Sequence, residues 1–301
     1  MTQACWICGS SDTSLWKPNN AAGALTPDDL RVTDSRYGVT LDLWRCARCE
    51  FVFAAGADSE LLPRLYERMD DPGYLESAAS RRLQMLWLLQ NVLRVHSGAR
   101  SLLDVGAGTG LLVQAAQQAG LTATGVEPSE AFVEHARRTA GVELLQGHFP
   151  HPALAGRTFD IVCLIDVIEH VTEPVPLLRA CAAALNPDGI LAVVTPDIGS
   201  IPARIMGARW WHFRLAHVGY FNKRSLDVAM AAAGLYAVDR FRAKWFFRVR
   251  YIAHRLRRYL PVDRLNRLAR RKRILRRAYE RVIPLNTRDS FALLLRRAET
   301  S

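Results

Sequence analysis

Short apolar runs alternate with amphipathic segments through the middle of the chain. The runs are rich in Val, Ile and Leu and are bounded by turn-forming or charged residues. Between them, as at 111–119, apolar residues recur at spacings of three and four, which predicts helices. This alternation predicts a mainly parallel sheet with helices between its strands. The strands are expected at 102–105, 121–127, 142–145, 159–165 and 190–196.

The flanking segments extend this pattern on both sides. Residues 60–95 carry a helical stripe of apolar positions, and two further apolar runs at 235–238 and 289–295 predict a sixth and a seventh strand. The chain has 301 residues, half of them hydrophobic, so it can bury a large core. We therefore expect an α/β domain over 59–301, preceded by a small domain over 1–58.

The first buried strand ends in an acid and three alternating glycines. Asp104 is followed by Gly106, Gly108 and Gly110, and glycines at this spacing allow positive φ and close approach to a ligand. The next helix directs free N–H groups toward the same place. The turn lacks both the Gly-x-Gly-x-x-Gly dinucleotide fingerprint and the Lys of a phosphate loop. A ligand-binding turn and an ordinary strand-to-helix connection remain the two interpretations.

The same stretch, 102–110, resembles motif I of the class I S-adenosylmethionine (SAM)-dependent methyltransferases, in which an apolar strand with an acid precedes Gly-x-Gly-x-Gly. The resemblance implies a Rossmann-like seven-stranded sheet closed by a β-hairpin. It implies that Asp104 orients the amino-acid end of SAM. A Tyr from a helical lead-in often lies near the SAM carboxylate in such enzymes, which makes Tyr74 a candidate. The turn would approach SAM through Gly106, Ala107, Gly108 and Gly110.

Glu127 ends the second predicted strand, seventeen residues after Gly110. A carboxylate at this place can accept hydrogen bonds from both ribose hydroxyls of a nucleoside, although an acid before Pro128 can also be a helix-entry residue. The resemblance favours ribose binding, with Pro128 beside it. After the third strand many members of the family carry an acid that meets the adenine amino group. Here His148 stands in its place, so Phe149 stacking and backbone groups are expected to serve the adenine.

Three polar residues follow the fourth strand, Asp166, Glu169 and His170. Open α/β sheets place their ligands at the carboxyl ends of their strands. The Asp-x-x-Glu-His pattern resembles the post-strand-4 motif of small-molecule O-methyltransferases, including those of quinone biosynthesis, so Asp166 is a candidate for the SAM site. The three side chains could also hold a divalent cation, or cap and pack the following helix.

Two histidines lie among aromatic residues after the fifth strand. His212 follows two tryptophans, and His217 precedes a Tyr-Phe pair and a helix that is expected to begin near Ser225. A similar segment covers the active site in this methyltransferase group. An imidazole that titrates near neutrality can accept a hydroxyl proton as the methyl group arrives. His217 is the first candidate for a general base, and His212 and His170 are the further candidates. A structural role in packing is the alternative.

The first fifty residues contain two Cys-x-x-Cys pairs. Cys5 with Cys8 and Cys46 with Cys49 can supply four thiolates to a tetrahedral zinc ion, which leaves no open position for catalysis. We expect a structural zinc ribbon here. Disulfides do not suit a reducing compartment, and neither pair opens a helix after a buried strand as redox pairs do.

The net charge of +11 is concentrated near the carboxyl terminus, where residues 240–281 hold seventeen Arg and Lys but only two acids. Two basic amphipathic helices are predicted in an insertion over 240–286, the first beginning at Trp245. The aromatic and arginine side chains of 245–282 suit an anionic membrane surface or a lipid-linked substrate. A helical hairpin packed on the core with a solvated arginine face, and nucleic-acid binding, are the alternatives.

Together these features predict a SAM-dependent methyltransferase that acts on a hydroxyl, or a sugar carbon, of a small-molecule, glycan or lipid-linked acceptor. The alternatives are an RNA methyltransferase that holds phosphate with the ribbon and the arginine helices, and a SAM-fold binding protein without activity. After strand 4 the RNA-type Asn/Asp-Pro-Pro-Tyr motif is missing. We find neither a secretory signal nor an apolar run of about eighteen residues. The expected location is the cytoplasm, with peripheral contact at the inner membrane face.

Overall fold

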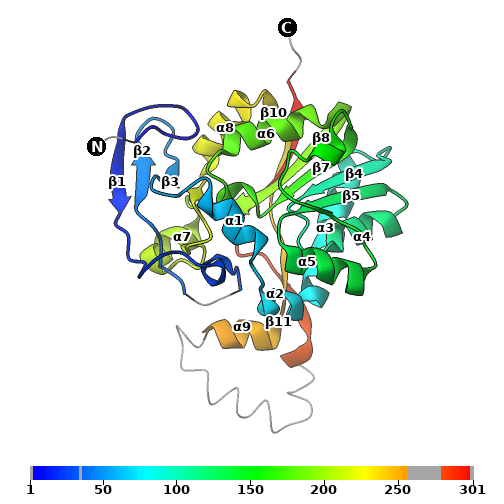
Figure 1. Ribbon diagram of the computed structural model, residues 1–301, viewed down its shortest axis with the longest axis horizontal. Coiled ribbons are helices and arrows are strands. Elements are labelled where there is room, and N and C mark those ends of the chain that lie inside the picture. Colours follow the sequence, from blue (N-terminus) through cyan, green and yellow to red (C-terminus); the bar gives the residue numbers. More distant parts are fainter. Residues whose placement is uncertain (1–2, 34–35, 257–278, 299–301) are drawn as a thin grey trace.

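A seven-stranded sheet forms the centre of the protein. The computed structural model describes residues 3–33, 36–256 and 279–298. Strands β13 and β10 run antiparallel to their neighbours, and the other adjacent pairs are parallel. All seven expected strands are present, although the third begins three residues later and the fifth five residues earlier than predicted. Their order is β10 (Leu235–Arg242), β13 (Ser290–Arg297), β8 (Leu185–Pro196), β7 (Phe159–Ile165), β4 (Ser101–Val105), β5 (Thr122–Glu127) and β6 (Leu145–Gln146) (Figure 1).

Helices cover both faces of this sheet because its central strands are apolar on both sides. Successive residues of a strand point to opposite faces. Leu102 and Ile161 therefore pack with α3 (Ala78–Val95) and α4 (Leu111–Gln118). Leu103 and Val162 are in the core that includes α6 (Pro174–Ala183) and α8 (Lys223–Ala232). Burial on both faces is typical of a parallel sheet between two layers of helices.

Local capping explains where two helices next to the site begin. The Asp71 side chain accepts a hydrogen bond from the Tyr74 N–H at 3.1 Å, and Pro72 occupies the first position of α2 (Pro72–Glu76). Asn222 caps α8 and accepts from the Ser225 N–H at 2.9 Å, while Ser225 Oγ accepts from the Asn222 N–H at 2.8 Å. Ser225 is thus the third residue of the helix and the reciprocal partner of the Asn222 cap.

The N-terminal segment forms a second sheet that continues into the α/β part of the chain. Its antiparallel order is β1 (Thr13–Lys17), β2 (Leu43–Cys46), β3 (Val52–Ala54) and β9 (Gly219–Tyr220) (Figure 1). Phe51 is completely buried, and its ring centroid lies 4.8 Å from that of Phe221. Residues 1–58 therefore share both a sheet and a hydrophobic core with later parts of the chain.

The prediction of a helix beginning at Trp245 is wrong. Residues Trp245–Arg248 form strand β11, which pairs antiparallel with β12 (Val282–Leu285), and helix α9 covers Val249–Leu256. Strand β10 also runs to Arg242, inside the predicted insertion. The aromatic run of β11 and the β-branched start of β12 favour a strand pair, and β11 contacts α3. The predicted second helix falls mainly on 257–278, outside the described residues.

The remaining described helices are α1 (Leu61–Glu67), α5 (Glu130–His135) and α7 (Ile201–Met206), together with the short helical turns η1 (Pro27–Leu30), η2 (Ala136–Ala140), η3 (Pro152–Leu154), η4 (Ile168–His170) and η5 (Gly207–Arg209). In Figure 1, α1 and α2 lie between the N-terminal sheet and the central sheet. Among the described helices, none combines the length and the apolar character needed to cross a bilayer.

Candidate active site

A cavity of about 1480 Å³ lies at the carboxyl ends of the parallel strands. Chain connections diverge there between β4 and β7, the place where open α/β sheets bind ligands. The predicted Gly110 is the left-handed N-cap of α4 and does not line the cavity. The other predicted residues of the SAM site and the catalytic site all do: Tyr74, Asp104, Gly106, Ala107, Gly108, Glu127, Pro128, His148, Phe149, Asp166, His170, His212 and His217.

The glycine turn is shaped by side chains from two other segments. Gly106 and Gly108 have φ values of 74° and 54°. A Cβ on Gly108 would lie 2.8 Å from the Tyr74 hydroxyl oxygen, and one on Gly106 would lie 2.5 Å from Val167 Cγ2. Both distances are shorter than van der Waals contact, so both the backbone conformation and the available space require glycine here.

Glu127 is held by backbone donors beside this turn. Its carboxylate accepts hydrogen bonds from the Gly108 N–H at 2.7 Å and the Ser129 N–H at 2.9 Å. Burial raises the pKa of Glu127 to about 7, although both N–H donors favour the ionised form. Burial and the nearby Glu127 carboxylate also raise the pKa of Asp104 to about 7. The two acids therefore lie close to a change of charge at neutral pH.

Tyr74 and Asp166 both line the cavity, and Arg81 interacts electrostatically with each of them. The Arg81 guanidinium lies 3.6 Å from the Tyr74 ring centroid. Asp166, with a left-handed φ of 53°, directly follows β7. Burial raises the pKa of Asp166 to about 7, and Arg81 opposes that rise. The sequence analysis missed Arg81 because one arginine on a helix surface carries no signal by itself.

His148 lies at the rim of the cavity and reaches α1. Its Nε2 atom lies 3.1 Å from Glu67 Oε1, and both side chains are nearly half exposed. The residue that replaces the usual adenine-binding acid thus has an acidic partner of its own. Phe149, the next residue, also lines the cavity.

The three candidate histidines lie together. The ring centroids of His170 and His217 are 4.7 Å apart, and those of His212 and His217 are 5.6 Å apart. His170 Nδ1 lies 2.7 Å from the Ala216 carbonyl oxygen and also contacts the Tyr66 hydroxyl. Burial lowers the pKa of His170 to about 4 and that of His217 well below its usual value.

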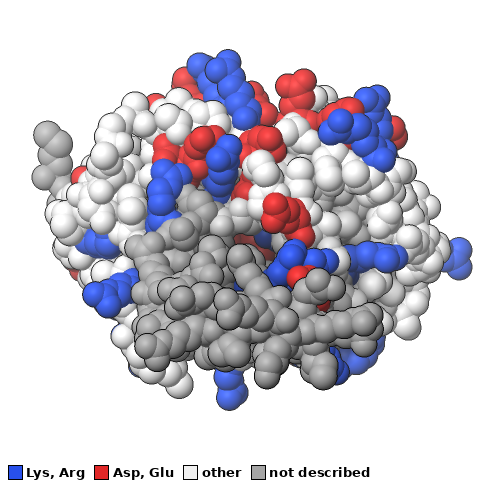
Figure 2. Space-filling view, turned by 90° about the horizontal axis from the view of Figure 1, so that it is seen from below, with Lys and Arg blue, Asp and Glu red and all other residues white. Residues whose placement is uncertain are grey.

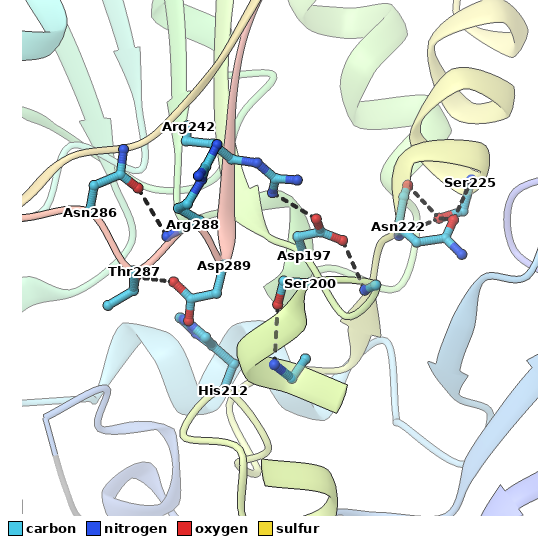
Figure 3. A network of polar contacts seen from close by, with 12 residues as sticks. Asp197, Ser200, His212, Asn222, Ser225, Arg242, Asn286, Thr287, Arg288 and Asp289 are labelled. Carbon is cyan, nitrogen blue, oxygen red and sulfur yellow. Dashed lines mark hydrogen bonds and ion pairs between the residues drawn. The ribbon is translucent and has the colours of Figure 1, made fainter. Parts of the chain in front are cut away.

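His212 differs from the other two because it faces a buried carboxylate. Its Nε2 atom lies 3.5 Å from Asp289 Oδ2, and Asp289 also accepts from Trp210 Nε1 at 3.4 Å and from the Thr287 hydroxyl (Figure 3). Asp289 was missed as a site residue and was predicted only as part of the last strand. Because β13 runs antiparallel to β8, its first residues lie where β8 ends.

Two groups in the described part of the chain bring together enough ligand atoms for a metal ion. Cys5, Cys8, Cys46 and Cys49 form the first, and Glu169, His170 and His217 form the second. Within each group the ligand atoms lie within 4.8 Å of one another. Glu169 Oε1 and His217 Nδ1 are buried without a hydrogen-bond partner. The second group could therefore receive a cation or polar atoms of an acceptor.

Comparison with known proteins agrees with this geometry. A family model described as a methyltransferase domain matches residues 60–240, more than half of the chain. The chain belongs to the class I SAM-dependent methyltransferases. This membership confirms the family suggested by the glycine turn and the fold predicted from it.

The methyltransferase is similar to curated relatives over part of its length. It is 33% identical over 150 residues to the ubiquinone biosynthesis O-methyltransferase of Methylocella silvestris, which covers 46% of this chain and 59% of that one. The ubiquinone biosynthesis O-methyltransferase of Azorhizobium caulinodans is 32% identical over 171 residues, which cover 50% of this chain and 68% of that one. The chain spans only 45% of the Haemophilus ducreyi relative. It thus matches about half the length of such relatives.

A solved structure shows the same fold. The structure of a mitomycin 7-O-methyltransferase superposes with a TM-score of 0.50 at 18% identity, covering 81% of this chain and 62% of that one. At this identity the similarity concerns the arrangement of the sheet and helices and not the ligand.

Proposed function

We propose that this methyltransferase moves a methyl group from SAM to a hydroxyl of a small-molecule acceptor. One observation carries the proposal: the glycine turn with Glu127, and the histidines with Asp289, line the same cavity. The printed name of the curated relatives, ubiquinone biosynthesis O-methyltransferase, supports a small hydroxyl acceptor. Glycan, lipid-linked and RNA acceptors are the competing outcomes of the experiment below.

The residues present fit SAM. When bound, SAM supplies an electrophilic methyl group on a sulfonium. Gly106 and Gly108 leave the space that a Cβ would fill, and Glu127 keeps lone pairs available for ribose hydroxyls after accepting its two backbone hydrogen bonds. Arg81 offers a cation near Asp166 and Tyr74 for the SAM carboxylate. Positioning in a buried cavity supplies much of the catalysis.

The acceptor can be identified directly. Purified protein is incubated with [methyl-³H]SAM and a small-molecule extract, a lipid extract or total RNA from the producing cells, and the labelled product is identified. We expect label in a small molecule as a methyl ether. Label only in RNA or lipid-linked sugar would contradict the proposed acceptor, and lack of SAM binding by titration calorimetry would contradict the enzyme itself.

We also propose that the four N-terminal cysteines bind a structural zinc ion. The Sγ atoms of Cys5 and Cys49 are 3.5 Å apart, and those of Cys8 and Cys46 are 3.6 Å apart. Four sulfur atoms at such separations can surround one tetrahedral ion. Metal analysis should find one zinc per chain, and purified protein without stoichiometric metal would contradict the site.

The proposed contact of 245–282 with an anionic membrane surface rests mainly on basic residues outside the described part of the chain. Trp245, Phe246 and Phe247 line the cavity, and ten of the seventeen basic residues lie within 257–278. On the face shown in Figure 2, the described Lys and Arg side chains are interspersed with Asp and Glu. Flotation with anionic liposomes should be lost when 249–281 is replaced by a Gly-Ser linker, and equal flotation of both proteins would contradict the contact.

A further inference from the structure

Asp289 is fixed at the edge of the cavity by four different contacts. Thr287 donates its hydroxyl hydrogen bond to one carboxylate oxygen, while Trp210 Nε1 lies 3.4 Å and His212 Nε2 lies 3.5 Å from the other. The Asp289 carbonyl oxygen accepts from the Asp197 N–H at 2.8 Å. Figure 3 shows the carboxylate between Thr287 and His212. The side chain is 1% exposed, so its orientation does not depend on solvent.

This arrangement gives Asp289 the negative charge that an orienting carboxylate needs. Although burial raises its pKa, the hydrogen bonds from His212, Thr287 and Trp210 leave the pKa of Asp289 below the ordinary value. An ionised carboxylate can only accept hydrogen bonds, so the ring nitrogen that faces it must be an N–H donor. The Nε2 atom of His212 then carries the hydrogen, and its Nδ1 atom keeps a free lone pair.

The other two histidines have no ionised carboxylate of this kind: Glu169 lies near both, but burial raises the pKa of Glu169 well above its ordinary value. His170 Nδ1 is already engaged by the Ala216 carbonyl and Tyr66, and burial lowers the pKa of His170 to about 4. His217 Nδ1 has no hydrogen-bond partner, and burial together with His170 lowers its pKa well below the usual value. Burial lowers the pKa of His212 as well, but there the Asp289 carboxylate opposes the change.

We propose that His212 is the proton acceptor for the hydroxyl substrate and that Asp289 is the positioning residue that fixes its ring and tautomer. This inference rests on the proposed methyl transfer to a hydroxyl. The proton moves from the acceptor oxygen to Nδ1 of His212. The freed electron pair of the oxygen forms the bond to the methyl carbon, and the electrons of the broken carbon–sulfur bond remain on sulfur.

The chain offers a matched set of variants. Asp289→Asn removes the charge at nearly constant shape, Asp289→Glu restores it, and His212→Ala removes the base. Asp197→Asn is the control, because Asp197 is also buried in this corner and pairs with Arg242 at 2.7 Å. It is not among the described residues that line the cavity. Circular dichroism melts verify that each variant is folded.

The first measurement needs no acceptor. Two-dimensional ¹⁵N NMR correlation of the histidine rings, with His212 assigned by its loss in His212→Ala, reports the tautomer. We expect the Nε2–H tautomer in the native protein, in Asp289→Glu and in Asp197→Asn, and a shift toward Nδ1–H in Asp289→Asn. An Nδ1–H tautomer in the native protein, or no change in Asp289→Asn, would overturn the proposal.

The second measurement is the initial rate of ³H transfer from SAM to 3,4-dihydroxybenzoate or to the small-molecule extract. General bases contribute about 10²–10⁴ in rate, so His212→Ala and Asp289→Asn should each lose about 100-fold or more, with SAM affinity unchanged. Asp289→Glu should recover much of the rate. An active native enzyme whose Asp289→Asn variant is equally active would refute only the pair, whereas an inactive native enzyme would refute the proposed function.

Discussion

The residue with the strictest local requirement is Gly108. Its φ of 54° suits glycine, and a Cβ would lie 2.8 Å from the Tyr74 hydroxyl. Gly108→Ala should therefore lower SAM affinity about tenfold or more, because each 1.4 kcal/mol of clash or displacement costs a factor of about ten. Titration calorimetry measures this effect.

Gly141 supplies the control for that substitution. It has a similar φ of 64°, but no atom lies within 4 Å of its added Cβ. Gly141→Ala should lose about 1 kcal/mol of folding stability through its left-handed backbone and keep the native SAM affinity. Equal loss of SAM affinity in both variants would show that general strain, and not the turn, is responsible.

Glu127 should make SAM binding depend on pH. Ribose hydroxyls need the ionised carboxylate, and the pKa of Glu127 in the free protein is about 7. Affinity should therefore rise as pH increases through 7, and be about tenfold weaker at pH 6 than at pH 8, since the ionised fraction of such a group rises from about a tenth to about nine tenths between these values. Glu127→Gln should bind more weakly and lose this slope.

The slope has a second possible source in Asp104, whose pKa is also about 7. Asp104→Asn is measured alongside for this reason. If the slope persists in Glu127→Gln and disappears in Asp104→Asn, the pH dependence comes from Asp104. That result would contradict the proposal that the ionised Glu127 carboxylate binds the ribose.

At the scale of elements, the pairing of β3 with β9 connects the cysteine cluster to the histidine segment. Ala54 N–H donates to the Val218 carbonyl at 2.8 Å, and Val218 N–H donates to the Glu169 carbonyl at 2.9 Å. Strand β3 begins three residues after Cys49. An ion held by the cysteines would therefore stabilise the segment that carries His217.

Cys8→Ser tests this connection. We expect loss of zinc and faster hydrogen exchange at Val218 and Tyr220, while SAM affinity stays within about threefold because the glycine turn belongs to the other sheet. Cys181→Ala is the control, since Cys181 is a buried cysteine in α6 outside the cluster. Unchanged exchange in a zinc-free Cys8→Ser protein would show that the cysteine cluster does not support this segment.

The misassigned element, β11, shows how tertiary contacts override a helical pattern. The spacing of Trp245, Val249 and Ile252 suits a helix, and α9 does form over the later part. The earlier residues instead pair with β12, which follows far along the chain, and Trp245 packs against the buried cluster that includes Leu88 of α3. Periodicity within a short window contains no information about such a distant partner.

At the scale of the whole molecule, residues 1–58 are expected to be part of the folding unit. Phe51 and Phe53 are fully buried in the core that also contains Phe221 and Leu226. A fragment of residues 59–301 would expose this apolar surface, and each large side chain left exposed costs about 1.5–3 kcal/mol. The fragment should aggregate or melt well below the intact chain.

Differential scanning calorimetry and light scattering measure this difference. Adding residues 1–58 as a separate zinc-loaded peptide should raise the melting temperature of the fragment. If the fragment melted at the same temperature as the intact protein, residues 59–301 would instead form an independent domain with the predicted boundary.

The sequence by itself determined the succession of the seven strands of the central sheet along the chain and the position of the glycine turn. These features depend on local periodicity, on glycine conformations and on acids at strand ends, all of which lie within short stretches of the chain. The tertiary structure decided what local patterns cannot contain: that β3 pairs with β9, that β11 is a strand, and that Asp289 lies against His212. Each of these depends on contacts between residues far apart in the chain, and such contacts form only when the sheet brings those residues to one edge.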